Sequence, residues 1–600
     1  MAKKFYNKRD IDFLLYEVFD VEALTKYDYF SDHDKDSFNM TLEAAADIAE
    51  KELKPYGKAM DEYDPQLVDG KIIVHPQVRR MMQVFGEGGW IPATFPYEDG
   101  GQQLPNMIMN NVSFIWGAAN YSSMVYPFLT TGASNLIRTF GSKALQEQFL
   151  PNMFAGKWQG TMAMTEPDAG SSLSDITTSA APTEDGFYKI KGQKIYISGG
   201  DHDGVDNIVN LTLARIKDAP KGIRGISLFV VPQQRIAADG SLEDNDVITA
   251  GVYHKMGYAG TPIAHLTMGE YDDCRGYLVG EANKGLSYMF QMMNEARVSV
   301  GISAVSIASA AYYASLEYAF ERPQGRKIGN KDLSKPQVAI IEHADVKRML
   351  LFQKSIVEGC LSLCMQCSEY ADLALVTEDE EKEKNHLLLD LLTPIVKTYP
   401  SEMGCLTTSA GLQILGGAGY CKDFPLQQYF REARIHPIHE GTTGIHGLDL
   451  LGRKVMMKNG KAYQLFMAEV QATIKKAASI TALAQRTNEL ANNLKTLHKV
   501  SMHLLALAKQ NKVETFLSDA TLYLEMFGII TIAWQWLKMG IVAHKKLATT
   551  KMTADANNFY QGKMHALRYF YEYELPKTHS LAQRLISDDK VTLDIANEYF

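Results

Sequence analysis

The sequence predicts an α+β fold that is mostly α, in which helical domains flank a small middle domain of β-barrel or β-sandwich type. Two observations lead to this expectation. Apolar residues recur at three- and four-residue spacing from residue 40 to about 158, and again from about 286 to 453, which is the period of a helix. Between about 161 and 280, short alternating runs lie between Gly, Asp and Pro clusters, as in strands joined by turns.

The elements divide the chain into five expected parts. Residues 1–39 form an N-terminal extension with one amphipathic element over 11–19. Residues 40–160 form an N-terminal helical domain, in which Leu42, Ala45 and Ile48 share a helix face. Strand-like runs at 187–192 and 223–232 place the β domain at 161–283. A second helical bundle at 284–453 and a further helical domain at 454–600 complete the chain.

Composition excludes disordered, fibrous and collagen-like proteins. The 600 residues are 46% hydrophobic and 22% charged, with a formal net charge of -9. Six unevenly spaced cysteines do not form a disulfide framework, and no signal peptide is visible, so we expect a cytoplasmic protein. Residues 451–600 hold 20 Lys and Arg against 12 Asp and Glu. Such a basic region either meets an anionic surface or is simply a solvated helical bundle.

Two long apolar stretches, 301–316 and 527–542, predict buried helices. Neither reaches the roughly 20 clean residues that a membrane span requires, and Lys538 interrupts the second. We expect no transmembrane segment, while peripheral membrane contact through the second stretch is the alternative.

Three other motifs resemble cofactor or metal sites, but the surrounding sequence argues against each of these interpretations. Cys360, Cys364 and Cys367 have a spacing used for iron–sulfur clusters, but an unbroken helical period places them on one buried helix face. The Gly-Gly-Ala-Gly at 416–419 follows a helix rather than a strand, which argues against a Rossmann site. The histidines lack the helical ligand pairs of a zinc site, so no metal is expected.

Four segments carry chemistry together. They are Met162-Ala-Met-Thr-Glu-Pro-Asp-Ala-Gly-Ser-Ser, Gly192-Gln-Lys-Ile-Tyr-Ile-Ser-Gly-Gly, Leu412-Gln-Ile-Leu-Gly-Gly-Ala-Gly-Tyr and Arg434-Ile-His-Pro-Ile-His-Glu-Gly-Thr-Thr-Gly-Ile. In this order and spacing they resemble the acyl-CoA dehydrogenase family of flavoproteins. The resemblance covers about residues 40–453 and includes the Gly-Trp-Ile-Pro run that begins at Gly89. The remaining C-terminal part resembles the large subgroup with an appended helical domain.

The resemblance implies an FAD-dependent enzyme that removes two hydrogens from an acyl-CoA thioester to give the trans-2-enoyl-CoA. Its partners would be the acyl-CoA substrate and an electron-transfer flavoprotein, and its FAD site would be shared in a homodimer or larger oligomer. Nucleic acid is not an expected partner. The rival functions are a flavoprotein oxidase of the same fold and a DNA-associated relative that uses the basic C-terminal region.

Glu440, in the segment His-Glu-Gly-Thr-Thr, matches the catalytic base of the family. A carboxylate that loses water when substrate binds becomes more basic, which suits removal of the α-proton. Glu295 is the rival, although alignment on Arg297 places Ala296 at the alternative base position, about 100° away around a helix. By resemblance the substrate-binding residues are Ser171, Asn294, Arg297 and Gly441. Many relatives have Asp in place of Asn294.

The resemblance also assigns the flavin contacts. The loop and strand of the β domain would face the isoalloxazine ring, and the second helical domain would grip the ribityl, phosphate and adenine parts. Ser171 would touch either FAD phosphate or the substrate. The expected residues are Met164, Thr165, Ser171, Tyr196, Ser198, Arg322, Gln324, Gln413, Gly417 and Thr442. Tyr196 replaces the tryptophan common in the family, and the aromatic that usually follows Arg322 is absent.

Overall fold

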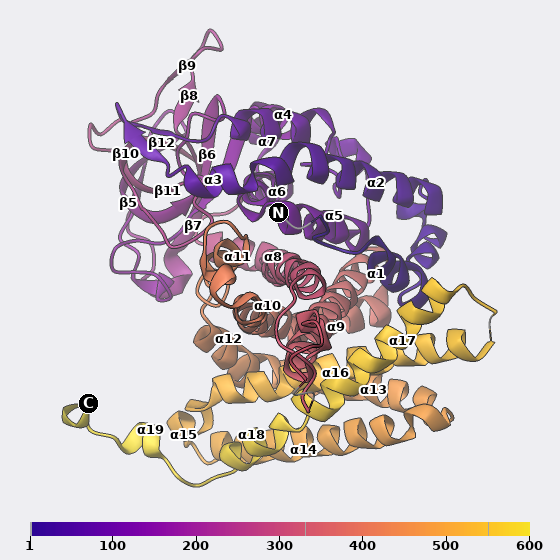
Figure 1. Ribbon diagram of the computed structural model, residues 1–600. Helices are drawn as coiled ribbons and strands as arrows, with labels where there is room; N and C mark the ends of the chain where they lie inside the picture. The colour runs from indigo at the N-terminus through magenta and orange to yellow at the C-terminus, as the bar shows by residue number, and fades with distance from the viewer. Residues whose placement is uncertain (1–2, 330–331, 550) are drawn as a thin grey trace. The chain divides into compact units, whose positions relative to one another are not determined.

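The computed structural model describes residues 3–329, 332–549 and 551–600, except for the side chains of 290–294 and 549. The chain forms two compact units, which are described separately. The β-containing unit is Asp36–Ala296, and the helical unit combines Met1–Lys35 with Arg297–Phe600. The fold is mostly helical with one main sheet (Figure 1), so the predicted fold class is confirmed.

Helices begin the β-containing unit, as the apolar period predicts. α6 contains Pro127 and is capped by Asn120, whose side chain accepts a hydrogen bond from the Ser123 N–H. The principal helices are α2 (Lys35–Ile48), α4 (Gln77–Glu87), α5 (Asn106–Ala119), α6 (Tyr121–Phe140) and α7 (Lys143–Phe154), with α3 (Gly57–Glu62) as a short turn of helix.

A hairpin that the sequence analysis did not predict interrupts these helices. β1 (Gln66–Val68) and β2 (Lys71–Ile73) pair antiparallel across Asp69 and Gly70. Both turn residues have positive φ, 48° and 79°, as a tight two-residue hairpin turn requires. The Asp-Gly pair between apolar residues was the available signal.

The middle segment folds into a sheet of eight strands. Six strands follow the order β10-β11-β5-β12-β7-β6, β3 closes one edge, and β4 pairs with both β5 and β6. β3 is parallel to β6, whereas β6 and β7 are antiparallel. The strands are β3 (Trp158–Ala163), β4 (Ser179–Pro182), β5 (Tyr188–Ser198), β6 (Asn207–Ile216), β7 (Ile226–Pro232), β10 (Val247–Val252), β11 (Ile263–Met268) and β12 (Arg275–Leu278).

The sheet packs against α6 and α7 through one apolar core. Phe149, Met153, Leu211 and Leu228 are buried in it. At Gly160 of β3, a Cβ would lie 2.6 Å from the Ala133 Cβ, so only glycine permits α6 to approach this closely. This packing fixes the end of β3, where the predicted flavin loop begins.

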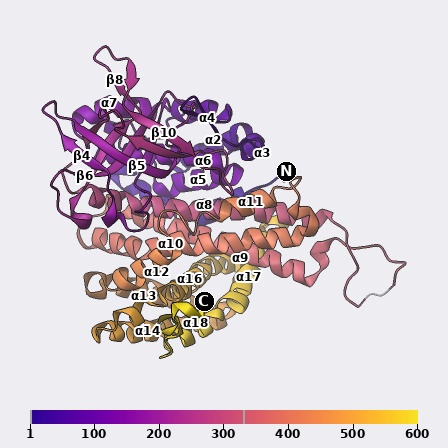
Figure 2. The same ribbon diagram turned by 90° about the vertical axis from the view of Figure 1, so that its left-hand side faces the viewer.

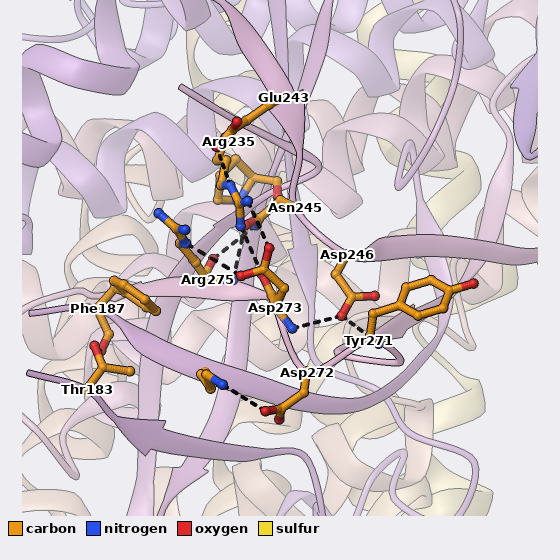
Figure 3. Close-up of polar contacts among 12 residues, drawn as sticks. Thr183, Phe187, Arg235, Glu243, Asn245, Asp246, Tyr271, Asp272, Asp273 and Arg275 are labelled. Atoms are coloured by element: carbon orange, nitrogen blue, oxygen red, sulfur yellow. Dashed lines mark hydrogen bonds and ion pairs between the residues drawn. The ribbon is translucent and has the colours of Figure 1, made fainter. Parts of the chain in front are cut away.

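A polar network joins the small hairpin of β8 (Gln234–Ile236) and β9 (Leu242–Asp244) to the turn before β12 (Figure 3). Arg235 forms ion pairs with Glu243 and Asp273 at 2.7 and 2.8 Å. The buried Asp246 carboxylate accepts the backbone N–H groups of Tyr271 and Asp273 at 2.8 and 3.1 Å. These bonds replace the solvation of the buried carboxylate and hold the turn in place.

Long helices make up the helical unit. α9 and α10 run side by side in both views (Figures 1 and 2), and α16 packs against both. The principal helices are α8 (Gly285–Glu321), which begins in the other unit, α9 (Ala344–Val376), α10 (Asp379–Leu415), α11 (Leu426–Ala433), α12 (Thr443–Asp449), α13 (Met457–Ala477), α14 (Ala484–Lys509), α16 (Ala520–Thr549), α17 (Ala554–Tyr569) and α18 (Lys577–Leu585).

The N-terminal segment packs into the helical unit rather than extending from it. Asp10, in the middle of α1 (Lys8–Asp12), accepts a hydrogen bond from Lys563 of α17 at 2.7 Å. Lys563 also pairs with Glu358 of α9 at 3.0 Å, and all three side chains are nearly inaccessible to water. One buried cation thus joins three segments that are far apart in the sequence.

Burial agrees with two sequence interpretations. Cys360, Cys364 and Cys367 are fully buried on α9, as expected for small apolar residues. Two helical stretches, Glu295–Glu321 and Val513–Ala548, are long and apolar enough to cross a membrane, so the argument from length made on the sequence was wrong. Their apolar windows are 94% and 89% buried inside the protein, as core helices would be.

Candidate active site

Glu440 lies in the loop between α11 and α12, in a constrained backbone conformation. Its φ is 53°, and Gly441 follows with φ 91°. A non-glycine residue in the left-handed region is strained, and such strain persists only where the surroundings enforce it. A Cβ on residue 441 would lie 2.8 Å from the His446 Nε2, so glycine is required there.

Three hydrogen bonds enforce this conformation. The His446 Nε2–H donates to the Glu440 carbonyl at 3.0 Å. The Lys397 ammonium donates to the carbonyls of His436 and Gly441, at 2.6 and 2.7 Å. Within the described residues, the Glu440 N–H donates no hydrogen bond, so it is available to an anionic oxygen.

The surroundings of Glu440 have opposing effects on the pKa of its carboxyl. Burial raises the pKa of its carboxyl above the ordinary value, while the positive charges of Arg297 and Lys397 lower it. Arg297, on α8, is buried and pairs with Asp449 of α12 at 3.5 Å. The pKa of the carboxyl is therefore set by the balance between burial and the two cations. A group that transfers protons needs a pKa that is matched to its reaction in this way.

The neighbouring histidines are neutral. Burial lowers the pKa of His439 and that of His446 to about 3, and lowers the pKa of His436 as well. His436 and His439 share a hydrogen bond of 3.1 Å between Nδ1 and Nε2. Because neither ring is charged at neutral pH, the cations that act on the Glu440 carboxyl are Arg297 and Lys397.

Met164 and Thr165 follow β3 in a loop that a buried ion pair anchors. The Lys194 ammonium donates to the Met164 carbonyl at 3.1 Å and to the Glu166 carboxylate at 2.8 Å. The same carboxylate accepts the Thr177 N–H at 2.6 Å. The Ile195 N–H donates to the Thr165 carbonyl at 2.9 Å, which places the loop beside β5.

The end of β5 presents Tyr196 and Ser198. Tyr196 has φ 59° and is 59% exposed, with its ring 4.7 Å from that of Tyr253. Ser198 is half-buried and its carbonyl accepts the Thr161 hydroxyl at 2.6 Å. An exposed aromatic face beside backbone amides and hydroxyl groups fits an isoalloxazine ring, so this part of the unit suits a flavin.

Four predicted flavin residues of the helical unit are exposed near the ends of long helices. Arg322 and Gln324 follow α8, and Gln413 and Gly417 lie at the end of α10. Open space surrounds Gly417, since a Cβ there would meet nothing within 4 Å. An exposed guanidinium such as that of Arg322 suits a phosphate. Gln413 is 16 residues beyond Lys397 on α10, roughly 24 Å along the helix axis.

The other predicted residues lie as follows. Thr442 caps α12, where its hydroxyl accepts the Ile445 N–H at 3.4 Å. Ser171 is exposed in the loop after β3. Glu295 is exposed and accepts a hydrogen bond from Asn135 at 3.2 Å. The side chain of Asn294 lies outside the described residues.

Sequence reasoning missed Lys194, Lys397 and His446. Each of them donates a hydrogen bond to a backbone carbonyl of a loop that the motifs had identified. The available signal was a charge in an apolar period, as in Leu391-Leu-Thr-Pro-Ile-Val-Lys, where a lysine falls on the buried face of a helix.

A carboxylate on a constrained turn and an aromatic, amide-rich surface on a β domain are features that suit a flavin-dependent dehydrogenase. Family models match nearly the whole chain. They are the acyl-CoA dehydrogenase N-terminal domain over residues 35–157, its middle domain over 161–270, its C-terminal domain over 283–456, and the acetyl-CoA dehydrogenase C-terminal like domain over 466–596.

Named relatives agree with the family models. The chain is 35% identical to 3-methylmercaptopropionyl-CoA dehydrogenase of Ruegeria pomeroyi, over 88% of this chain and 89% of the relative. It is 32% identical to a butyryl-CoA dehydrogenase of Syntrophomonas wolfei, over 99% and 98%. An acyl-CoA dehydrogenase of Bacillus anthracis, solved with FAD, shares the fold with a TM-score of 0.73 at 19% identity, over 98% and 93%. The chain belongs to the acyl-CoA dehydrogenase family, whose members are FAD-dependent oxidoreductases acting on CH–CH bonds.

Proposed function

We propose that this enzyme converts an acyl-CoA thioester to the trans-2-enoyl-CoA, with Glu440 as the base that removes the α-proton. The observation that carries the proposal is the carboxylate of Glu440 on a turn whose carbonyl is held by His446 and whose neighbours are held by Lys397. A base in a fixed position reacts faster because its orientation is settled before the reaction.

Proton removal depends on where the charges lie. Glu440 must be ionised to accept the proton, and Arg297 and Lys397 favour that ionised state. When an acyl chain displaces water, desolvation raises the basicity of the carboxylate, which suits removal of a weakly acidic proton. The Glu440 N–H would donate to the thioester oxygen as negative charge develops on it.

Bound FAD would supply the acceptor for the hydride that leaves the β-carbon. In our proposal Met164, Thr165, Tyr196 and Ser198 hold the ring system. The rest of the cofactor is assigned by the family resemblance to the residues Ser171, Arg322, Gln324, Gln413, Gly417 and Thr442, and the substrate to Ser171, Asn294, Arg297 and Gly441.

The proposed partner for reoxidation is an electron-transfer flavoprotein, and the proposed assembly is a homodimer or larger oligomer. Both follow from the family resemblance. A cytoplasmic location stays a prediction, which the free state of all six cysteines supports.

The test begins with an absorption spectrum of the purified protein, followed by anaerobic titration with short, medium and long saturated acyl-CoAs. Bleaching of a bound flavin, with formation of the enoyl-CoA, is the expected result, and the most effective chain length identifies the substrate class. A flavin that stays oxidised with every acyl-CoA would contradict the proposal. Rapid reoxidation of the reduced flavin by oxygen would favour the oxidase alternative.

A further inference from the structure

Lys397 is a buried cation that forms no direct ion pair within the described residues. The side chain is fully inaccessible to water on α10, in the apolar run Ile395-Val-Lys-Thr-Tyr. Within the described part of the chain it forms no ion pair, and its ammonium donates to two backbone carbonyls. Burying an ammonium costs several kcal/mol, so packing alone does not explain a lysine here.

The two carbonyls that it binds lie on either side of Glu440. His436 precedes the base by four residues, and Gly441 follows it directly. One ammonium therefore holds both ends of the turn at 2.6 and 2.7 Å. His446 holds the middle carbonyl, that of Glu440 itself, at 3.0 Å. The side chain and the N–H of Glu440 are left for the substrate.

We propose that Lys397 is a positioning residue for the base: its ammonium fixes the left-handed turn from both sides, aims the carboxylate and N–H of Glu440, and favours the ionised carboxylate. This inference rests on the proposed role of Glu440. It assigns two separable effects to one side chain, a geometric effect through hydrogen bonds and an electrostatic effect through charge.

The charges around Lys397 agree with this role. Burial lowers the pKa of Lys397 to about 8, and the negative charge of Glu440 is the main influence that raises it. Lys397 is thus protonated at pH 7. The charged or titratable groups that face Lys397 or the Glu440 loop are Arg297 on α8, Glu402 on α10, His436, His439 and Glu440 in the loop, and His446 and Asp449 on α12.

Two substitutions separate the effects. Lys397→Gln removes the charge and shortens the donor side chain, whereas Lys397→Arg keeps the charge but changes the donor geometry. Lys563→Met is the matched control, because it removes another fully buried lysine of the same unit at a distance in sequence from the loop. Flavin content and thermal unfolding are measured for every variant to separate folding from function.

The readout is the rate of anaerobic flavin reduction by a saturating acyl-CoA, as a function of pH. In Lys397→Gln we expect a loss of at least about 10-fold, since a misplaced base loses much of the about 10²–10⁴-fold that proton transfer contributes. The acidic limb of the profile should move up by about one pH unit, because a nearby cation no longer favours the carboxylate. Lys397→Arg should lose rate while its acidic limb stays in place.

The substrate dissociation constant should change by less than about 3-fold, because Lys397 acts on the turn rather than on the substrate. Flavin-loaded Lys397→Gln with the rate and pH profile of the unsubstituted enzyme would overturn the inference while leaving the role of Glu440 intact. A similar shift of the acidic limb in Lys563→Met would also overturn it. Glu440→Gln is measured in parallel. If this variant is as active as the unsubstituted enzyme, both the proposed role of Glu440 as the base and the positioning role of Lys397 are contradicted.

Discussion

The buried pair of Glu166 and Lys194 allows a prediction with a worked magnitude. The partners lower the pKa of Glu166 to about 2 despite its burial, and burial lowers the pKa of Lys194 to about 8. The two shifts share one attraction, that between the carboxylate and the ammonium, and burial opposes the charged form of both groups. Replacement of a whole buried ion pair by uncharged residues of similar volume is often close to neutral for stability, whereas loss of one partner is costly.

Single and double variants should therefore behave very differently. Lys194→Met leaves the Glu166 carboxylate buried without its cation, which costs about 3–5 kcal/mol. At about 2–4 °C per kcal/mol, the midpoint of thermal unfolding of the β-containing unit should fall by roughly 6–20 °C. The double variant Glu166→Gln, Lys194→Met should lie within a few degrees of the unsubstituted protein. Flavin content should fall in the single variant because Lys194 holds the Met164 carbonyl.

The pH dependence has a definite sign. A carboxyl whose folded-state pKa is lowered stabilises the protein above its unfolded value of about 4.5, and this contribution is lost as the pH falls towards 2. Differential scanning fluorimetry between pH 3 and pH 7 measures this loss, which should be absent from the double variant. The reasoning would be refuted if Lys194→Met unfolded at the same temperature as the unsubstituted protein, or if the double variant lost the sum of the two single effects.

Three further predictions concern the helical unit. Gly441→Ala should reduce flavin reduction by at least about 10-fold with little change in flavin content, because the added Cβ meets His446 at 2.8 Å and shifts the base; unchanged kinetics would show that the turn tolerates it. Lys563→Met should lower the unfolding midpoint, since Asp10 would lose its buried cation, and added Asp10→Asn should restore part of it; additive losses would contradict this. Cys421 is exposed and should react with a thiol reagent within minutes, whereas the α9 thiols should react only after denaturation; rapid labelling of four or more thiols would show that they are accessible.

The fold class and the chemical segments could be predicted from the sequence because they depend on local patterns. Helical period, strand alternation and the Glu-Gly-Thr-Thr segment are each visible within a dozen residues. The same is true of the buried cysteines, whose spacing places them on one helix face. The short β1–β2 hairpin was local as well, but its strands of three residues are too short for an alternating pattern to stand out.

The tethers of the active loops could not be predicted in this way. Lys397 is 39 residues from His436 and 44 from Gly441, and Lys194 is 30 residues from Met164. These hydrogen bonds join a side chain to a backbone carbonyl. Because every residue type has such a carbonyl, the sequence does not indicate which residue accepts the bond. The left-handed conformation of Glu440 could not be predicted either, because glutamate has no preference for that conformation.

The central claim is that Glu440 is the base. The most direct measurement is the rate of flavin bleaching after rapid anaerobic mixing with the preferred acyl-CoA, for the unsubstituted enzyme, Glu440→Gln and Glu295→Gln. Our account predicts that Glu440→Gln binds flavin normally and loses about 10²–10⁴-fold in rate, while Glu295→Gln stays within a few-fold of the unsubstituted enzyme. Rapid bleaching of Glu440→Gln, or loss of bleaching in Glu295→Gln alone, would contradict it.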